Sequence, residues 1–304
     1  MKRSIYDCVI VGGGPAGLSA ALILGRCRRS VLLCDSGQPR NARARELHGF
    51  LTRDCTPPLE LLQIGREQLQ RYPTVEYQQT VVVDGRCEDR HFELRLEGGE
   101  RVTCRKLLLA TGVIDELPEV EGLRELYGRS VFHCPYCDGW EHRDLPLAVY
   151  GKGKSGAGLS LTLSLWSKDL VLCTDGPGRI PAGDKARLNA SGVSVRSERI
   201  ARLEGQDGIL QRIVFAGGET LPRRAMFVSA KQQQHSDLAA RLGCAISPKR
   251  SVETGRLEMT SIPGLYVAGD ASRDVQLAVV AAAEGTRAAF AINKALLEEE
   301  LKGL

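Results

Sequence analysis

Short runs of consecutive apolar residues, each followed by a turn and a helical segment, organise much of the 304-residue chain. Residues 5–11 form the first run, and such runs are typical of parallel strands that are buried on both faces. The segment 18–24 has helical spacing, and 30–34 is a second apolar strand. The same order returns later, with a strand at 147–150 and a helix at 157–166. The pattern therefore predicts an α/β fold that contains a strand–helix–strand unit twice.

A glycine-rich loop joins strand to helix in both units. Gly12–Gly17 fits G-x-G-x-x-G, in which the glycines permit a tight turn, close approach of a pyrophosphate and close helix packing. Asp35 follows the next strand and can accept hydrogen bonds from a ribose. Gly151–Gly156 repeats the glycine pattern, and Asp175 follows a strand at 170–173. Two Rossmann-like, dinucleotide-binding domains are therefore predicted.

Shorter elements fill the rest of the chain. Turn signals at Asp84-Gly85 and Gly98-Gly99 separate strands, while 114–118 and Lys231–Gln234 are interpreted as linkers. A long polar stretch at 36–60 is typical of a functional loop. The other predicted elements are a helix at 59–72, strands at 75–77, 80–83, 92–96, 101–104, 106–110, 193–195, 200–203, 209–215, 225–228 and 265–268, and one or two helices over 277–301.

Composition narrows the class of protein. The hydrophobic content of 43% and charged content of 26% are globular values, and a net charge of +4 does not suit a dedicated nucleic-acid binder. The apolar runs fall short of the ~18–20 residues of a membrane span. The ten cysteines in a chain this long do not form a secreted disulfide framework. The apolar start at residues 8–11 is a strand and not a signal peptide, so we expect a cytoplasmic protein.

One closely spaced cysteine pair stands apart from the other eight cysteines. Cys134 and Cys137 are separated by two residues, and Asp138 follows directly. The pair can form a reversible disulfide, supply half of a zinc site, or be two unrelated core thiols. A zinc site needs a second ligand pair, which the sequence does not offer, so we predict no metal. The turn-like surroundings disfavour two core thiols, and a redox-active disulfide is the favoured interpretation.

Together these motifs resemble the low-molecular-weight thioredoxin reductase-like flavoproteins. The residues that carry the resemblance are Gly12–Gly17 with Asp35, Ala110-Thr111-Gly112, Cys134–Gly139, Gly151–Gly156, and Thr260–Ala278 with Gly269-Asp270. The resemblance implies FAD bound in a discontinuous first domain, which gives domains at 1–113, 114–242 and 243–304. The implied FAD-binding residues are Gly12, Gly14, Pro15, Ala16, Gly17, Asp35, Arg40, Asn41, Ala110, Thr111, Gly112, Gly269, Asp270, Gln276, Leu277 and Ala278.

The resemblance also implies roles around the cysteine pair. Cys137 would exchange electrons with the flavin, Cys134 would attack the substrate disulfide, and Asp138 would carry the proton. The implied substrate is a thioredoxin-like protein, and the implied assembly is a homodimer. The segment Cys134–Glu141, together with His48-Gly49-Phe50, is closer to a branch of dithiol oxidases that act on sulfur-bearing natural products.

The expected nicotinamide site departs from the family pattern G-G-G-D-S-A-x-E. Gly156 and Gly158 replace its Ala and Glu, and Thr174-Asp175-Gly176 stands where His-Arg-Arg would hold a 2′-phosphate. Three interpretations remain: use of NADH, a vestigial site with a ferredoxin-type donor, or NADPH held by Lys152, Lys154 or Arg179. We favour the vestigial site narrowly. Its residues would be Gly151, Gly153, Ser155, Gly156 and Asp175.

Three functional hypotheses follow. The first is an FAD-dependent oxidoreductase that passes electrons through the Cys134/Cys137 pair to a thioredoxin-like disulfide. The second is a dithiol oxidase that acts on a small molecule and passes electrons to oxygen. The third is a flavin-bearing redox sensor or electron-transfer protein.

Overall fold

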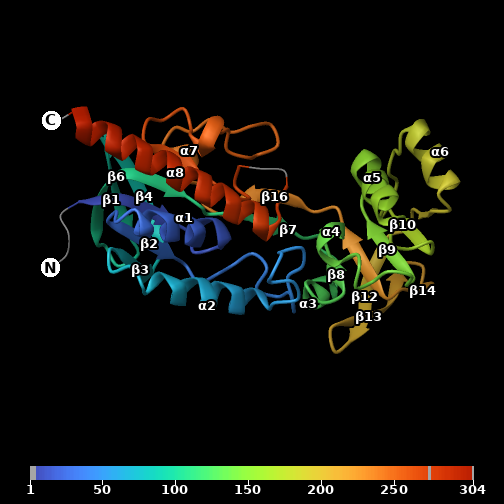
Figure 1. The fold of residues 1–304 in the computed structure, drawn as a ribbon. Helices are drawn as coiled ribbons and strands as arrows, with labels where there is room; N and C mark the ends of the chain where they lie inside the picture. Colours follow the sequence, from blue (N-terminus) through green and yellow to red (C-terminus); the bar gives the residue numbers. More distant parts are fainter. Residues whose placement is uncertain (1–4, 273–274, 303–304) are drawn as a thin grey trace. The chain divides into compact units, whose positions relative to one another are not determined.

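The computed structural model describes residues 5–272 and 275–302, which fall into two compact units (Figure 1). The first unit comprises Met1–Ala42, Phe50–Ile114 and Gln232–Leu304, and the second comprises Arg43–Gly49 and Asp115–Lys231. Each unit is built around a sheet with parallel strands and flanking helices. The predicted α/β class with two Rossmann-like domains is therefore confirmed.

The first unit contains a seven-stranded sheet in the order β3-β2-β1-β6-β5-β4, with β17 also paired to β6. Alternate residues of β1 enter different cores: Val9 faces one apolar cluster, and Cys8 and Ile10 face the other. Helices α1 and α8 cover the second of these faces, as Figure 1 shows. The strands are β1 Tyr6–Val11, β2 Val31–Asp35, β3 Val75–Gln79, β4 Val82–Glu88, β5 His91–Leu96, β6 Arg101–Leu109 and β17 Leu265–Val267. The helices are α1 Pro15–Arg26, α2 Pro58–Leu69, α7 Leu238–Arg241, the 3-10 turn η1 Arg256–Glu258 and α8 Ala278–Lys302.

Two predictions for the first unit are wrong in detail. The strands expected at 101–104 and 106–110 are one strand, β6, whereas the single helix α8 agrees with the one or two helices predicted over 277–301. Asp84-Gly85 is not a turn but lies inside β4, where the register with β5 shifts between Val82 and Asp84. A Cβ on Gly85 would lie 2.7 Å from Leu94, so the glycine allows close strand contact there.

The second unit contains a five-stranded sheet in the order β11-β10-β9-β15-β8, and its neighbouring strands are parallel. A separate antiparallel sheet has the order β12-β13-β14. The strands are β8 Val131–Phe132, β9 Leu147–Tyr150, β10 Leu170–Cys173, β11 Ser194–Arg196, β12 Ile200–Gln206, β13 Ile209–Phe215, β14 Thr220–Pro222 and β15 Ala225–Val228. The helices are α3 Leu123–Leu126, α4 Pro135–Asp138, α5 Gly153–Leu163 and α6 Ala182–Ala190. Helix α6 escaped prediction because Leu188 is its one buried residue, which leaves no apolar periodicity.

The boundaries of the units differ from the predicted domain limits in two places. The segments interpreted as linkers are paired strands, β7 Val113–Glu116 and β16 Lys231–Gln234, and the chain returns to the first unit at Gln232 and not at 243. The reason is α7, whose Leu238 is buried in the core of the first unit. The segment Arg43–Gly49 belongs to the second unit, where Arg43 donates a hydrogen bond of 2.7 Å to the carbonyl oxygen of Arg124.

Over the part of the chain that the structure describes, every helix is too short or too polar to cross a membrane.

Candidate functional site: a disulfide and two glycine loops

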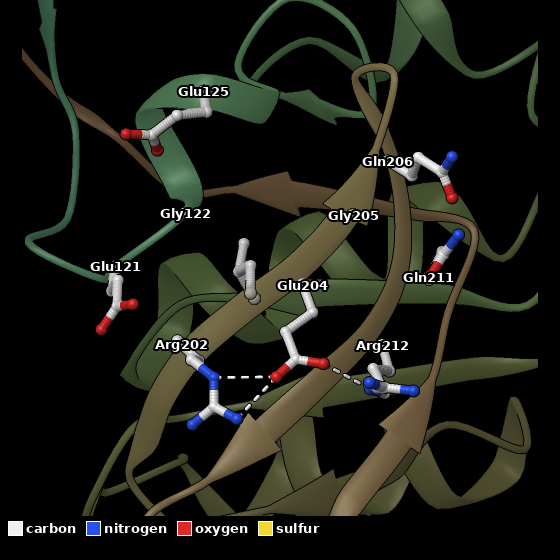
Figure 2. A pocket seen from close by; sticks show the side chains of 10 residues that line it. Glu121, Gly122, Glu125, Arg202, Glu204, Gly205, Gln206, Gln211 and Arg212 are labelled. Atoms are coloured by element: carbon white, nitrogen blue, oxygen red, sulfur yellow. Dashed lines mark hydrogen bonds and ion pairs between the residues drawn. The ribbon is translucent and has the colours of Figure 1, made fainter.

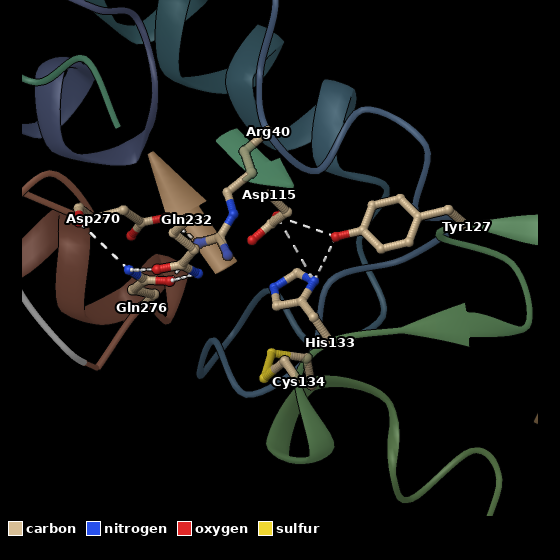
Figure 3. Close-up of a disulfide and its surroundings, with 9 residues drawn as sticks. Arg40, Asp115, Tyr127, His133, Cys134, Gln232, Asp270 and Gln276 are labelled. Carbon is tan, nitrogen blue, oxygen red and sulfur yellow. Dashed lines mark hydrogen bonds and ion pairs between the residues drawn. A yellow bond between two sulfur atoms is a disulfide. The ribbon is translucent and has the colours of Figure 1, made fainter. Parts of the chain in front are cut away.

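Cys134 and Cys137 form a disulfide at the start of α4 (Figure 3). Cys134 is the N-cap residue of this short helix, and its carbonyl oxygen accepts hydrogen bonds of 3.2 Å from the backbone N–H groups of Cys137 and Asp138. Pro135 suits the first helical turn because that position needs no N–H donor. The local sequence therefore folds into a single turn that brings the two Cα atoms to 5.3 Å from each other.

Asp138 directly follows the second sulfur and is partly buried. Burial raises the pKa of its carboxyl from the ordinary 3.8 to about 7, and the negative charge of Glu141 adds to the shift. A group with a pKa close to neutrality can both take up and release a proton at physiological pH. The Asp138 carboxyl can therefore exchange protons in the pH range in which thiol–disulfide exchange takes place.

Two exposed aromatic side chains flank the disulfide. Tyr136 is 68% exposed and lies edge-on to Trp166, with ring centroids 5.8 Å apart. Trp140 is 63% exposed, and the guanidinium of Arg143 lies 4.1 Å from its ring centroid. These rings give the region around the disulfide an apolar and aromatic surface within the second unit.

In the first unit, the loop Gly12–Gly17 leaves β1 and opens α1. A Cβ on Gly12 would lie 2.2 Å from the carbonyl oxygen of Ala110, and one on Gly17 would lie 1.8 Å from that of Gly12. Gly14 differs, because no described heavy atom comes within 4 Å of the Cβ position built there. Pro15 and Ala16 begin a helix that no side chain of the described residues caps. An open glycine beside uncapped helical N–H groups fits a pyrophosphate.

Asp35 ends β2 beside this loop and is buried. Its carboxylate accepts hydrogen bonds from Gly13 N–H at 3.3 Å, Gly37 N–H at 3.1 Å and the Tyr77 hydroxyl at 3.0 Å. These bonds fix the carboxylate close to the helix start, where a ribose of a bound dinucleotide would lie. Ala110, Thr111 and Gly112 follow the neighbouring strand β6, and Gly112 has a left-handed φ of 68°.

A third group of predicted residues surrounds Asp270. Arg40 donates hydrogen bonds of 2.8 Å to the Asp270 carboxylate and 2.7 Å to the Gln276 side-chain oxygen. The amides of Gln276 and Gln232 exchange two further bonds, as Figure 3 shows. Leu277 and Ala278 lead directly into α8, and Gly269 N–H donates to the buried Glu284 at 2.8 Å. Asn41 is exposed beside Arg40 in sequence.

These groups of the first unit fit FAD. The glycine loop suits its pyrophosphate, Asp35 suits a ribose, and the polar group around Asp270 suits a hydroxylated chain. When bound, the flavin would supply the two-electron chemistry that a disulfide needs. Arg40 is 230 residues from Asp270 and 236 residues from Gln276 in the sequence, yet the fold brings its guanidinium into contact with both.

The second glycine loop, Gly151–Gly156, still allows close packing between the loop and the helix that follows it. A Cβ on Gly156 would lie 2.5 Å from the carbonyl carbon of Gly151, so loop and helix α5 pack closely. Gly153 has a left-handed φ of 55°, and the Ser155 hydroxyl donates to the carbonyl oxygen of Lys152 at 3.1 Å. Gly158, at the family's Glu position, is exposed with no described heavy atom within 4 Å of its Cβ position.

The Asp175 carboxylate accepts hydrogen bonds from groups of the protein itself. It accepts one of 2.9 Å from the Tyr150 hydroxyl and another of 2.9 Å from Ile200 N–H. It therefore ties the ends of β9 and β10 to the start of β12. Arg196, at the end of β11, is committed to Glu198 and Glu219 and packs over the Phe215 ring. Where the family pattern would hold a 2′-phosphate, the chain therefore has the carboxylate of Asp175, and the guanidinium of Arg196 on the neighbouring strand is paired with two glutamates.

A surface pocket lies elsewhere in the second unit, against β12, β13 and the start of α3 (Figure 2). Its central carboxylate, Glu204, accepts hydrogen bonds from both Arg202 and Arg212. Glu121 and Glu125 also line it, so its lining carries three carboxylates and two guanidinium groups.

Sequence reasoning left out two residues that the structure places beside the disulfide segment. Asp115 and Tyr127 both contact His133, the residue before Cys134. They precede the cysteine pair along the chain without any recognisable spacing, so no sequence signal could have found them.

Comparison with known proteins agrees with these features. The family model described as "Pyridine nucleotide-disulphide oxidoreductase" matches residues 6–285. "Thioredoxin reductase tcpT" of Claviceps purpurea is 32% identical over 88% of this chain and 87% of its own length. The crystal structure of HlmI matches with a TM-score of 0.94 and 36% identity over 100% of this chain and 96% of HlmI. An oxidoreductase from Agrobacterium tumefaciens matches with a TM-score of 0.90 and 35% identity over 96% of this chain and 98% of that one. The chain therefore belongs to the pyridine nucleotide-disulphide oxidoreductase family and is a thioredoxin reductase-like, flavin-dependent disulfide oxidoreductase.

Proposed function

We propose that this enzyme reduces the disulfide of a thioredoxin-like protein through the Cys134/Cys137 pair, with electrons that come from bound FAD. The observation that carries the proposal is the Cys134–Cys137 disulfide with Asp138 beside it, whose pKa is raised to about 7. Curated relatives named thioredoxin reductase support the choice of a thioredoxin-like substrate.

In this proposal Cys134, Cys137 and Asp138 each carry out a different step of the exchange. Once the pair is reduced, the Cys134 thiolate attacks one sulfur of the substrate disulfide and forms a mixed disulfide. Cys137 then attacks Cys134, which closes the internal disulfide again and releases the second substrate sulfur. Asp138 gives its proton to a leaving thiolate and recovers one from the next reduction. The FAD would be held by the glycine loop Gly12–Gly17, Asp35, and the group around Asp270.

We propose further that the physiological electron donor is not NADPH. Asp175 and the committed Arg196 support this, as does the exposed Gly158 at the position of the family's glutamate. A ferredoxin-type protein is the donor that we favour. Cytoplasmic location and a homodimer are proposed from the family resemblance alone.

The same observation favours a second candidate function, a dithiol oxidase. A small dithiol would reduce the Cys134–Cys137 disulfide, and oxygen would finally accept the electrons, so no nicotinamide is needed. The aromatic surface of Tyr136 and Trp140 suits a small cyclic or aromatic dithiol as well as a protein.

Anaerobic titration of the FAD-loaded enzyme separates these possibilities. We expect flavin bleaching by reduced ferredoxin and none by micromolar NADPH, followed by turnover of thioredoxin disulfide. Bleaching by NADPH at that level would overturn the proposed donor. Rapid oxygen uptake with a small dithiol, without thioredoxin turnover, would favour the oxidase. A reducible cysteine pair with neither turnover would indicate a redox sensor.

Cys137→Ser provides the matched control. We expect the variant to retain FAD and to lose disulfide reduction, because the second attack has no nucleophile. Activity that survives in this variant would contradict the assignment of the pair.

A further inference from the structure

A buried carboxylate of α8 contacts the turn that carries Asp270. The Glu284 residue is only 5% exposed, and its Oε2 accepts a hydrogen bond of 2.8 Å from Gly269 N–H. Burial of an acidic side chain costs free energy unless hydrogen bonds compensate for the lost water. The thiol–disulfide exchange at the cysteine pair has no use for this carboxylate, so its place in the core of the first unit needs another explanation.

The backbone around Gly269 sets the direction of Asp270. Ala268 N–H still continues the sheet, with a hydrogen bond of 3.0 Å to the carbonyl oxygen of Leu109. Ser272 N–H then donates at 3.0 Å to the carbonyl oxygen of Gly269 and closes a four-residue turn. Gly269 has a left-handed φ of 82°, and Asp270 is the next residue of the turn. The hydrogen bond from Gly269 N–H to α8 therefore holds the turn at its first residue.

The residue that follows Glu284 contacts the other part of the predicted FAD site. A Cβ on Gly285 would lie 1.9 Å from the carbonyl oxygen of Ala16, in the first glycine loop. A Cβ on Gly269 would lie 3.2 Å from the Cβ of Ala16, so the turn also packs against this loop. Two consecutive residues of α8 therefore contact two different segments of the FAD site, one each.

We propose that Glu284 is a positioning residue for FAD, which acts by fixing the turn at Gly269 and, through it, Asp270. The inference rests on the proposed function, because there the group around Asp270 holds the hydroxylated chain of FAD. Arg40 donates a hydrogen bond of 2.8 Å to the Asp270 carboxylate, as Figure 3 shows. Asp270 is thus oriented by Arg40 at its side chain and by Glu284 at the backbone of its neighbour.

ADP distinguishes this role from a general loss of packing. It carries a pyrophosphate and a ribose, which suit the first glycine loop and Asp35, but it lacks the hydroxylated chain that Asp270 would hold. Loss of the Glu284 oxygen should therefore weaken the binding of FAD and leave the binding of ADP unchanged. Gly285→Ala instead presses on Ala16 of the loop and should weaken both ligands by similar factors.

The test titrates the FAD-loaded enzyme with ADP and measures the released FAD in the filtrate after ultrafiltration. The ADP concentration that displaces half of the FAD reports the ratio of the two affinities. Glu284→Met removes the oxygen acceptor at a similar side-chain size, and we expect this concentration to fall by about tenfold, the usual order for a lost buried hydrogen bond. Glu284→Gln keeps an oxygen acceptor and should stay close to the parent. Gly285→Ala should leave the concentration nearly unchanged.

A double variant tests the route through Asp270. In an Asp270→Ala background, Glu284→Met should lower the ADP concentration no further, because residues that act through one another are not additive. Unfolding midpoints show whether each variant is folded, and Glu284→Ala is used if methionine prevents folding. An unchanged concentration in the folded single variant, or additive effects in the double variant, would overturn the inference. A lowered concentration in an enzyme without thioredoxin turnover would support it and refute the proposed function alone.

Discussion

Gly285 of α8 lies directly against Ala16 at the start of α1: a Cβ on Gly285 would be 1.9 Å from the Ala16 carbonyl oxygen. The two helices cross at this point through small residues, and Ala20, Ala281 and Ala288 are buried in the same cluster. The C-terminal helix therefore supports the backbone of the first glycine loop. Because Ala16 belongs to that loop, packing of α8 and binding at the loop should be linked.

Gly285→Ala should destabilise the protein by about 1–3 kcal/mol, the usual cost of overpacking a close contact, and should weaken FAD retention. Thermal unfolding and flavin content after gel filtration provide the measurements. Gly158→Ala in α5 is the matched helical control. That glycine is exposed with open space at its Cβ position, so alanine should be neutral or slightly stabilising there. Equal effects of the two substitutions would refute the close-packing argument.

The pH dependence of disulfide reduction should follow Asp138. Its carboxyl has a pKa of about 7, partly because of the charge on Glu141, so reduction of substrate by the pre-reduced enzyme should slow as pH rises through that value. Glu141→Gln removes the negative charge and should move this decline to lower pH. Asp138→Asn should remove the decline altogether and slow the reaction. Stopped-flow profiles provide the measurement, and an unchanged decline in Asp138→Asn would assign it to another group.

Stability should depend on the same carboxyl. Between its ordinary pKa of 3.8 and the folded value of about 7, the folded protein holds a proton that the unfolded chain has released. Stability from this group therefore falls as pH rises through that interval. Comparison of unfolding midpoints at pH 5 and pH 8 should show this contribution in the parent and its loss in Asp138→Asn.

The internal hydrogen bonds of Asp175 should matter for stability. Asp175→Ala removes the acceptors of the Tyr150 hydroxyl and of Ile200 N–H, and it also places alanine at a left-handed φ of 49°. We expect a loss of about 1–3 kcal/mol. Asp175→Asn keeps an oxygen acceptor and tolerates this backbone, so it should cost less than 1 kcal/mol, roughly. Similar denaturation midpoints for the Ala and Asn variants would contradict this structural role.

An ion pair joins Lys106 of β6 to Glu299 of α8, and substitution of its two partners should change stability by different amounts. Lys106 in β6 is 8% exposed and pairs with Glu299, which is 46% exposed. Glu299→Ala leaves a buried ammonium without this carboxylate and should cost about 1–3 kcal/mol. Lys106→Met leaves Glu299 near solvent and still paired with Arg105 at 3.0 Å, so it should cost less. Denaturant unfolding of both variants measures the difference, and the reverse order would contradict the burial argument.

Much of the fold follows from local patterns. Apolar runs and glycine loops predicted both strand–helix–strand units, because buried parallel strands and tight phosphate-type turns impose strong local constraints. Helix α6 cannot be predicted from the sequence, because it lacks apolar periodicity. Asp84-Gly85 has the composition of a turn, but tertiary pairing with β5 overrides this local preference and places it within a strand.

The sequence by itself determined the features that are contiguous along the chain: the glycine loops, the Cys134/Cys137 spacing, and Asp138 beside the pair. Only the tertiary structure decided the burial and the hydrogen-bond partners of these side chains. Burial and Glu141 raise the pKa of Asp138, and the fold directs Asp175 toward Tyr150 and Ile200. It also brings Asp115 and Tyr127 to His133. Spacing fixes local geometry, whereas desolvation and long-range hydrogen bonds exist only once distant segments pack together.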